Sequence, residues 1–136
     1  MELNPYLAFD GQCKAAFEFY QQCLGGEIVA MVTYADTPMA AQMPAEAQGK
    51  IAHARLHTGG RVLMGGDSPQ NGHAAPAGFS VNVGVDDPAE AERVFAALGQ
   101  NGTVRMPIAE TFWAHRFGML VDQFGTPWMV NCMKTP

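Results

Sequence analysis

The chain has 136 residues, of which 48% are hydrophobic and 15% charged, and its formal net charge is −5 with only eight Lys and Arg. This length and balance favour one compact folded domain and exclude a disordered chain. No basic cluster exists for nucleic acid or an acidic membrane surface, and no apolar run approaches the roughly 18 residues of a membrane span. The start MELNPYLAFDG lacks a signal peptide pattern, and the three cysteines form no CxxC motif, so we expect reduced thiols in a cytoplasmic protein.

The first half of the chain predicts a strand, a helix and three further strands. A strand over 4–9 ends at an Asp-Gly turn, and a helix over 13–23 has apolar residues at helical spacing before a Gly-Gly pair. An Ile- and Val-rich strand follows over 27–34. The segment 37–49 is a loop that either covers a pocket mouth or lies plainly on the surface. The segment HARLHTGGRVLMGGD reads as strand, tight glycine turn and strand, which predicts a hairpin.

The second half repeats this order of elements. A strand over 79–85 meets an Asp-Asp-Pro turn, and Pro88 suits the first turn of a helix that runs to about Leu98. A strand over 103–108 follows, and GMLVDQFGTPWMVNC forms the second hairpin. In that hairpin Pro127 limits pairing on one side, which predicts an edge strand or a bulge.

The two halves also match residue by residue. Gly26 corresponds to Gly102, 76 positions later, and Met64 corresponds to Met129, 65 positions later. Such a long period indicates a duplicated module rather than a repeat array.

We therefore predict one α+β domain over residues 1–136, built from two strand–helix–strand–strand–strand modules. The modules span 1–67 and 79–132, and a Gly- and Pro-containing linker over 68–78 joins them. One helix can cover only one face of a four-stranded sheet, so the other face must meet something else. A cleft formed by the free faces is the natural place for a ligand.

The sequence resembles the vicinal oxygen chelate superfamily, which includes glyoxalase I, extradiol dioxygenases and bleomycin-resistance proteins. Within it the sequence is most similar to the PhnB-like branch, which also carries the label 3-demethylubiquinone methyltransferase-like domain. The matching segments are NPYLAFDG with AFEFYQQCLGG, IAHARLHTGGRVLMGGD, GFSVNVGVDDPAEAERVFAAL and ETFWAHRFGMLVDQFGTPWMVN. The resemblance implies the glyoxalase/bleomycin resistance fold, a cupped eight-stranded mixed sheet with the helices outside, and a homodimer.

Metal-dependent members of this superfamily take their ligands, usually His and Glu, from the first and fourth strands of each module. The matching positions hold Asn4 or Pro5, Ser80 or Val81, Met64 and Met129. None of these is His or Glu, so we predict no metal site and no other cofactor. The methyltransferase label also lacks a strand–GxGxxG–helix cofactor unit.

Three side chains are candidates for catalysis. His53 opens a strand, while Glu110 and His115 flank the start of another, where a carboxylate beside an imidazole would form a general-base pair. The same three residues would also bind a divalent metal. This alternative is a metal-dependent lyase or isomerase of the glyoxalase type. Each residue equally fits an ordinary strand or loop position, because no spacing is diagnostic, and whether the chain is an enzyme stays open.

Our first hypothesis is a PhnB-like protein that binds a small organic ligand in an apolar cleft without a metal. We predict that eight residues line it: Tyr6, His53, Met64, Trp113, Phe117, Met119, Met129 and Asn131. Arg55 or Arg116 would hold an acidic group of the ligand. Alternatively the aromatic rings fill a core or an interface, and the protein is a structural or interaction module.

Overall fold

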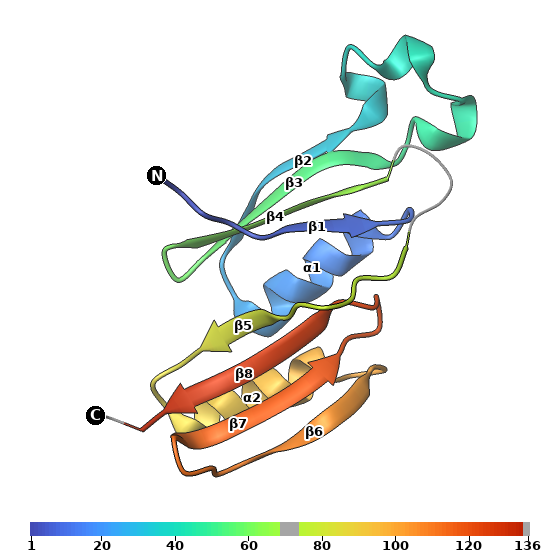
Figure 1. The fold of residues 1–136 in the computed structure, drawn as a ribbon. Helices are drawn as coiled ribbons and strands as arrows, with labels where there is room; N and C mark the ends of the chain where they lie inside the picture. The colour runs from blue at the N-terminus through green and yellow to red at the C-terminus, as the bar shows by residue number, and fades with distance from the viewer. Residues whose placement is uncertain (69–73, 135–136) are drawn as a thin grey trace. The chain divides into compact units, whose positions relative to one another are not determined.

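A computed structural model describes residues 1–68 and 74–134, so the predicted linker over 68–78 lies partly outside the described residues. The chain forms two compact units, one within residues 1–74 and the other within 75–136. Each unit combines one α-helix with a four-stranded sheet (Figure 1). Among the helices that the structure describes, none has the length and apolar character needed to cross a membrane.

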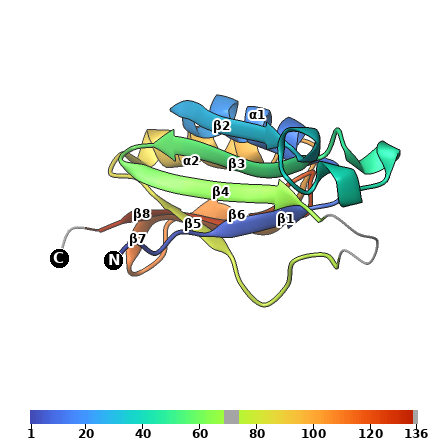
Figure 2. The same cartoon turned by 90° about the horizontal axis from the view of Figure 1, so that it is seen from above.

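The first unit contains β1 (Tyr6–Phe9), α1 (Cys13–Leu24), β2 (Glu27–Thr33), β3 (Ile51–Thr58) and β4 (Arg61–Asp67). The strand order is β1–β4–β3–β2, which Figure 2 shows from above. β1 runs parallel to β4, and the other pairs are antiparallel. The connection between β2 and β3 contains short 3-10 helices at Tyr34–Asp36, Ala40–Gln42 and Ala45–Ala47, of which the last two lie in the predicted loop over 37–49.

The second unit contains β5 (Val81–Gly84), α2 (Pro88–Leu98), β6 (Thr103–Ala109), β7 (Ala114–Val121) and β8 (Pro127–Met133). Its order, β5–β8–β7–β6, repeats that of the first unit, again with one parallel pair. The prediction that Pro127 marks an edge strand or a bulge is wrong, because β8 lies between β5 and β7 and pairs with β7 at Pro127 without a register shift. Pro127 is instead the first residue of β8, a position that tolerates its missing N–H.

One face of each sheet packs against its own helix. A Cβ atom added to Gly65 on β4 would lie 2.8 Å from the ring of Phe17 on α1. A Cβ added to Gly118 on β7 would lie 2.6 Å from the ring of Phe95 on α2. Both sheets therefore use a glycine to let a helix aromatic side chain lie directly on the strand, and Phe17 is fully buried there.

The strand register reproduces the sequence repeat. Tyr6 lies opposite Met64 in the first sheet, and Asn82 lies opposite Met129 in the second. The two methionines are the positions that the repeat matches, and Asn82 follows Tyr6 by 76 positions. The first-strand residues beside the methionines are therefore Tyr6 and Asn82, rather than the slightly earlier positions expected from the family resemblance.

Candidate functional site

The face of the first sheet that points away from α1 carries three of the predicted ligand residues. Tyr6 and Met64 are register partners, and the ring of His53 stacks on that of Tyr6 with centroids 5.9 Å apart and planes at 26°. The Tyr6 hydroxyl donates a 3.3 Å hydrogen bond to the carbonyl oxygen of Ala52. Burial is the main cause that raises the pKa of the Tyr6 phenol. The hydroxyl therefore serves as a neutral donor near pH 7, not as a base.

Arg55 lies on the same face, two residues along β3 from His53. Its register partners are Ala30 on β2 and Met64 on β4. Its Nε atom is buried and has no hydrogen-bond partner among the described residues. The guanidinium of Arg55 thus adds a positive charge to the face that carries the predicted ligand residues of the first unit.

The second sheet presents four of the predicted ligand residues on the face away from α2. Met119 lies opposite Met129, and Phe117 lies opposite Asn131. The amide nitrogen of Asn131 donates to the sulfur of Met133 at 3.1 Å. The Asn131 Oδ1 atom is buried and lacks a partner within the described part of the chain. This face therefore combines thioethers and an aromatic ring with one unused hydrogen-bond acceptor.

Trp113 borders this surface just before β7. Its ring meets that of Phe117 edge-on, with centroids 5.4 Å apart, and that of Phe112 at 4.8 Å. The Trp113 side chain is 38% exposed, whereas that of Phe117 is 8% exposed. Trp113 thus continues the apolar surface towards solvent, and all five ligand residues predicted in this unit lie on one connected surface.

Glu110, a candidate for catalysis, forms an ion pair near the end of the chain. Its carboxylate pairs with the Lys134 ammonium at 3.1 Å. The hydrogen bond from Lys134 is the main cause that lowers the pKa of Glu110. A carboxylate that is already paired and is weakly basic makes a poor general base. The charge of His115 also contributes slightly to the lowered pKa of Glu110, so the general-base pair of these two residues stays a prediction.

Local irregularity in β7 also changes the expectation for its basic residues. The register shifts between Ala114 and Arg116, so the regular alternation of β7 is interrupted at His115. Arg116 pairs with Glu92 of α2 at 3.2 Å, on the helix side of the sheet. Of the two arginines predicted to hold an acidic group, only Arg55 is without a carboxylate among residues 1–68 and 74–134.

The residues at the family-equivalent positions do not fit a divalent metal. No group of three or more His, Cys, Asp or Glu side chains in the described parts of the chain is arranged to hold a metal ion. The alternative site built from His53, Glu110 and His115 stays a prediction, because His53 belongs to the first unit and the other two residues to the second. The family-equivalent positions offer thioethers, a phenol and an amide, which are poor donors for hard or borderline divalent cations.

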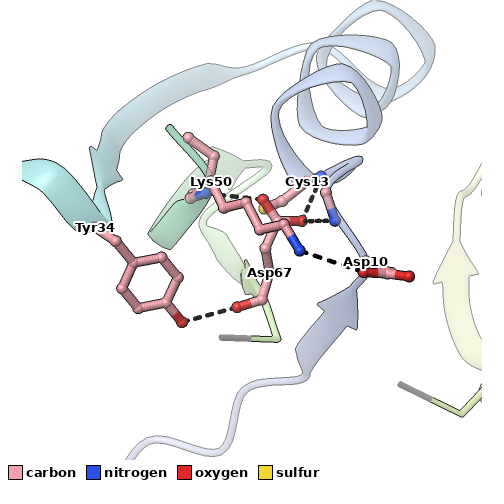
Figure 3. Close-up of polar contacts among 7 residues, drawn as sticks. Asp10, Cys13, Tyr34, Lys50 and Asp67 are labelled. Atoms are coloured by element: carbon pink, nitrogen blue, oxygen red, sulfur yellow. Dashed lines mark hydrogen bonds and ion pairs between the residues drawn. The ribbon is translucent and has the colours of Figure 1, made fainter. Parts of the chain in front are cut away.

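Asp67, at the end of β4, is a buried carboxylate whose importance the sequence analysis missed. One carboxylate oxygen accepts from the backbone N–H groups of Gly11 and Cys13 at 2.8 and 3.0 Å, and the other accepts from Ile51 N–H at 2.8 Å. The Tyr34 hydroxyl donates to the Asp67 carbonyl at 2.8 Å (Figure 3). These bonds join the start of α1, the start of β3 and the end of β4. The role of Asp67 is structural, and only its place after a strand signals it in the sequence.

Cys13 shows that this cluster is not a nucleophilic site. Burial, with a smaller contribution from the Asp67 carboxylate, raises the pKa of the Cys13 thiol to about 12. A reactive cysteine needs a thiolate near neutral pH, and this environment opposes one. All three cysteines are buried, and none forms a disulfide within the described residues.

A second buried carboxylate organises the β7–β8 turn. Asp122 accepts from the N–H groups of Phe124 and Thr126 at 2.8 and 3.1 Å, and from the indole N–H of Trp128 at 2.8 Å. Trp128 is 1% exposed, so its ring belongs to the core and not to the ligand face. Asp122 therefore holds the β7–β8 turn and the core tryptophan together.

Comparisons with known proteins cover almost the whole chain. The model of the Glyoxalase/Bleomycin resistance protein/Dioxygenase superfamily matches residues 2–130. Protein YjdN of Escherichia coli strain K12 is 37% identical over 142 residues, which covers 98% of this chain and 97% of that protein. The crystal structure of protein PA1353 from Pseudomonas aeruginosa is 45% identical, with a TM-score of 0.90 and 99% of both chains covered.

A structure from Bacillus cereus is more distant but carries a functional name. It is similar at 26% identity with a TM-score of 0.78, covering 97% of this chain and 99% of that one. Its name includes the words PhnB protein and 3-demethylubiquinone-9 3-methyltransferase.

Proposed function

We propose that this chain, which belongs to the Glyoxalase/Bleomycin resistance protein/Dioxygenase superfamily, binds a small organic ligand on the helix-free faces of its sheets without a resident metal. The observation that carries the proposal is the surface of the second sheet. Met119, Met129 and Phe117 supply apolar area there, and the buried Asn131 Oδ1 lacks a partner among the described residues. Apolar walls with a few unused polar atoms are typical of small-molecule sites. The oxygen is closed to solvent in this conformation, so a ligand N–H or O–H would satisfy it once the Asn131 side chain turns towards the surface.

We also place the chain in the PhnB-like branch of the superfamily. The name of the Bacillus cereus relative and the similarity along nearly the full length support this assignment. The methyltransferase activity in that name is not part of the proposal. The glycine-rich segment GGRVLMGG lies in the β3–β4 hairpin, whereas a cofactor-binding glycine loop joins a strand to a helix.

Replacing Met129 with glutamine tests the apolar surface. We expect the wild-type protein to bind a neutral fluorescent probe, N-phenyl-1-naphthylamine, saturably, and Met129→Gln to weaken the binding roughly tenfold, because burial of a methionine contributes about 1.5–3 kcal/mol. The measurement is a fluorescence titration at constant protein concentration.

Met31→Gln is the matched control for this experiment. Met31 is also partly buried, but its register partner is the fully buried Ala54, on the helix side of β2. This variant should lose stability and keep the affinity for the probe. Equal affinities of the wild type and Met129→Gln, or a wild type without saturable binding, would count against the proposed ligand surface.

We further propose a cytoplasmic homodimer. Three buried cysteines without a disulfide among the described residues are typical of proteins in reducing compartments. Several large apolar side chains are exposed in the isolated chain, among them Phe112 at 89% and Met133 at 58%, as expected where a partner subunit packs. Light scattering during size-exclusion chromatography should give twice the chain mass of 14.6 kDa. A mass of one chain across the accessible concentration range would rule the dimer out.

A further inference from the structure

Arg55 differs from the other basic residues of the chain. Four ion pairs are present among the described residues, and they engage Lys50, Arg93, Arg116 and Lys134. The other basic side chains are Lys14, Arg55, Arg61 and Arg105, and all of them except Arg55 are exposed to solvent. Arg55 is therefore the cation that is partly withdrawn from water without receiving a carboxylate from the described chain.

The fold itself does not require a cation at this position. In the second sheet the equivalent residue is Met119, because Met119 pairs with Met129 just as Arg55 pairs with Met64. A methionine would satisfy the same packing without a charge. Burial of an unpaired guanidinium N–H costs free energy, and arginine cannot escape the cost by losing its proton. Packing alone therefore does not account for an arginine at this position.

The surroundings of Arg55 are suited to the binding of an anion. Its cross-strand neighbours, Ala30 and Met64, are apolar, so they do not compete for the guanidinium. Of the guanidinium nitrogens, only Nε is buried without a hydrogen-bond partner among the described residues. The two terminal nitrogens are not closed off in this way and stay available to a ligand. The acidic residue nearest by register is Glu27, which lies opposite His57 at the far end of β2 and forms no ion pair with Arg55.

We propose that Arg55 binds an oxyanion group, carboxylate or phosphate, of a ligand whose remaining part is apolar or aromatic. The fork of N–H groups on arginine matches two oxygens of such a group. The stacked rings of Tyr6 and His53 on the same face provide a surface for the apolar part. This inference rests on the proposed function, since it names the class of ligand that the helix-free face of the first sheet selects.

The test compares two probes that differ by one anionic group. The fluorescent dye 1-anilinonaphthalene-8-sulfonate carries a sulfonate, and N-phenyl-1-naphthylamine has the same ring system without it. Arg55→Gln should weaken binding of the sulfonate probe roughly 10- to 100-fold, the range for hydrogen bonds to charged groups. Binding of the neutral probe should change less than about twofold, because apolar burial is retained. Arg55→Lys keeps the charge but loses the fork, and should fall between.

Arg61→Gln is the matched control. It removes the same charge from the same sheet, but Arg61 is exposed at the start of β4. It should leave both affinities unchanged. Competition against the sulfonate probe with benzoate and with phenyl phosphate then separates carboxylate from phosphate as the preferred group.

The outcomes distinguish the two proposals. If neither probe binds the wild type, the proposed function itself fails. If both probes bind and Arg55→Gln weakens them equally or not at all, the apolar site stands and the anion site is overturned. If Arg55→Gln does not fold, Arg55→Lys serves as the test. If this variant prefers the sulfonate probe over the neutral probe as strongly as the wild type does, a positive charge alone is sufficient, and the specific role of the guanidinium fork is overturned.

Discussion

Replacing Asp67 with alanine is expected to lower the free energy of unfolding by about 4 kcal/mol. The carboxylate is 3% exposed and accepts three backbone N–H bonds, from Gly11, Cys13 and Ile51. Each buried donor that loses its partner costs about 1–3 kcal/mol, and partial relaxation keeps the sum below the maximum. Domains of this size are stabilised by only about 5–15 kcal/mol, so the variant should be close to unfolding at physiological temperature. Urea denaturation followed by circular dichroism measures the loss.

Asp10→Ala is the control for that experiment. Asp10 lies near the same β1–α1 turn, but its side chain is 62% exposed and only pairs with Lys50 at 3.5 Å. Exposed ion pairs contribute about 0–1 kcal/mol, so the control should stay close to the wild type. Asp67→Asn keeps the shape but presents an amide N–H to one of the backbone donors, and should lose an intermediate amount. Similar small losses for Asp67→Ala and Asp10→Ala would show that the buried bonds contribute little.

The second large effect is expected at Gly26, the residue between α1 and β2. Its φ angle is 95°, and a Cβ atom would overlap the carbonyl oxygen of His57. Gly26→Ala should lower the free energy of unfolding by about 1–2 kcal/mol from the backbone conformation and about 1–3 kcal/mol more from the steric conflict. Thermal and urea denaturation of the purified variant would measure the sum.

Gly25→Ala, at the residue directly before Gly26, is the matched control. Its φ angle is 79°, but a Cβ atom there would meet nothing within 4 Å. Gly25→Ala therefore isolates the conformational part, and the difference between the two variants measures the close approach. The interpretation would be contradicted if the two variants were equally stable. Gly102 makes the equivalent close approach in the second unit, since a Cβ atom there would overlap the carbonyl oxygen of Val121. Both copies of the module therefore place a glycine against a strand carbonyl at this point.

Much of the fold was predictable because the repeat leaves local signals in the sequence. The helix predicted over 13–23 is observed at Cys13–Leu24, and the one beginning at Pro88 ends at Leu98 as predicted. Periodic apolar residues and glycine or proline at the ends determine these elements locally. The superfamily fold of class α+β, with two βαβββ units, is confirmed. The first strand is shorter than predicted and begins at Tyr6, because only there does pairing with β4 start.

The candidate site was less predictable, because it depends on contacts between distant segments. The stacking of Tyr6 on His53 joins strands 47 positions apart in the sequence. The carboxylate of Asp67 has its partners 16 to 56 positions away, and no local pattern marks it. Glu110 and His115 were attractive as neighbours in the sequence, but a lysine near the end of the chain pairs with the first, and a register shift interrupts the alternation at the second. The sequence shows which side chains have the chemistry for a site, but it does not show the distant residues that these side chains contact in the fold.

The parallel pairing of β1 with β4 also affects the order in which the chain folds during its synthesis. Tyr6 pairs with Met64, so β1 cannot join its sheet until almost the whole first unit has been synthesised. Every strand pairing of that sheet nevertheless lies between residues 6 and 67, so none depends on the second unit. During translation, the first sheet can be completed while the ribosome is still producing the second. The duplicated architecture thus allows folding in two successive steps, each slowed by the closure of one long-range parallel pair.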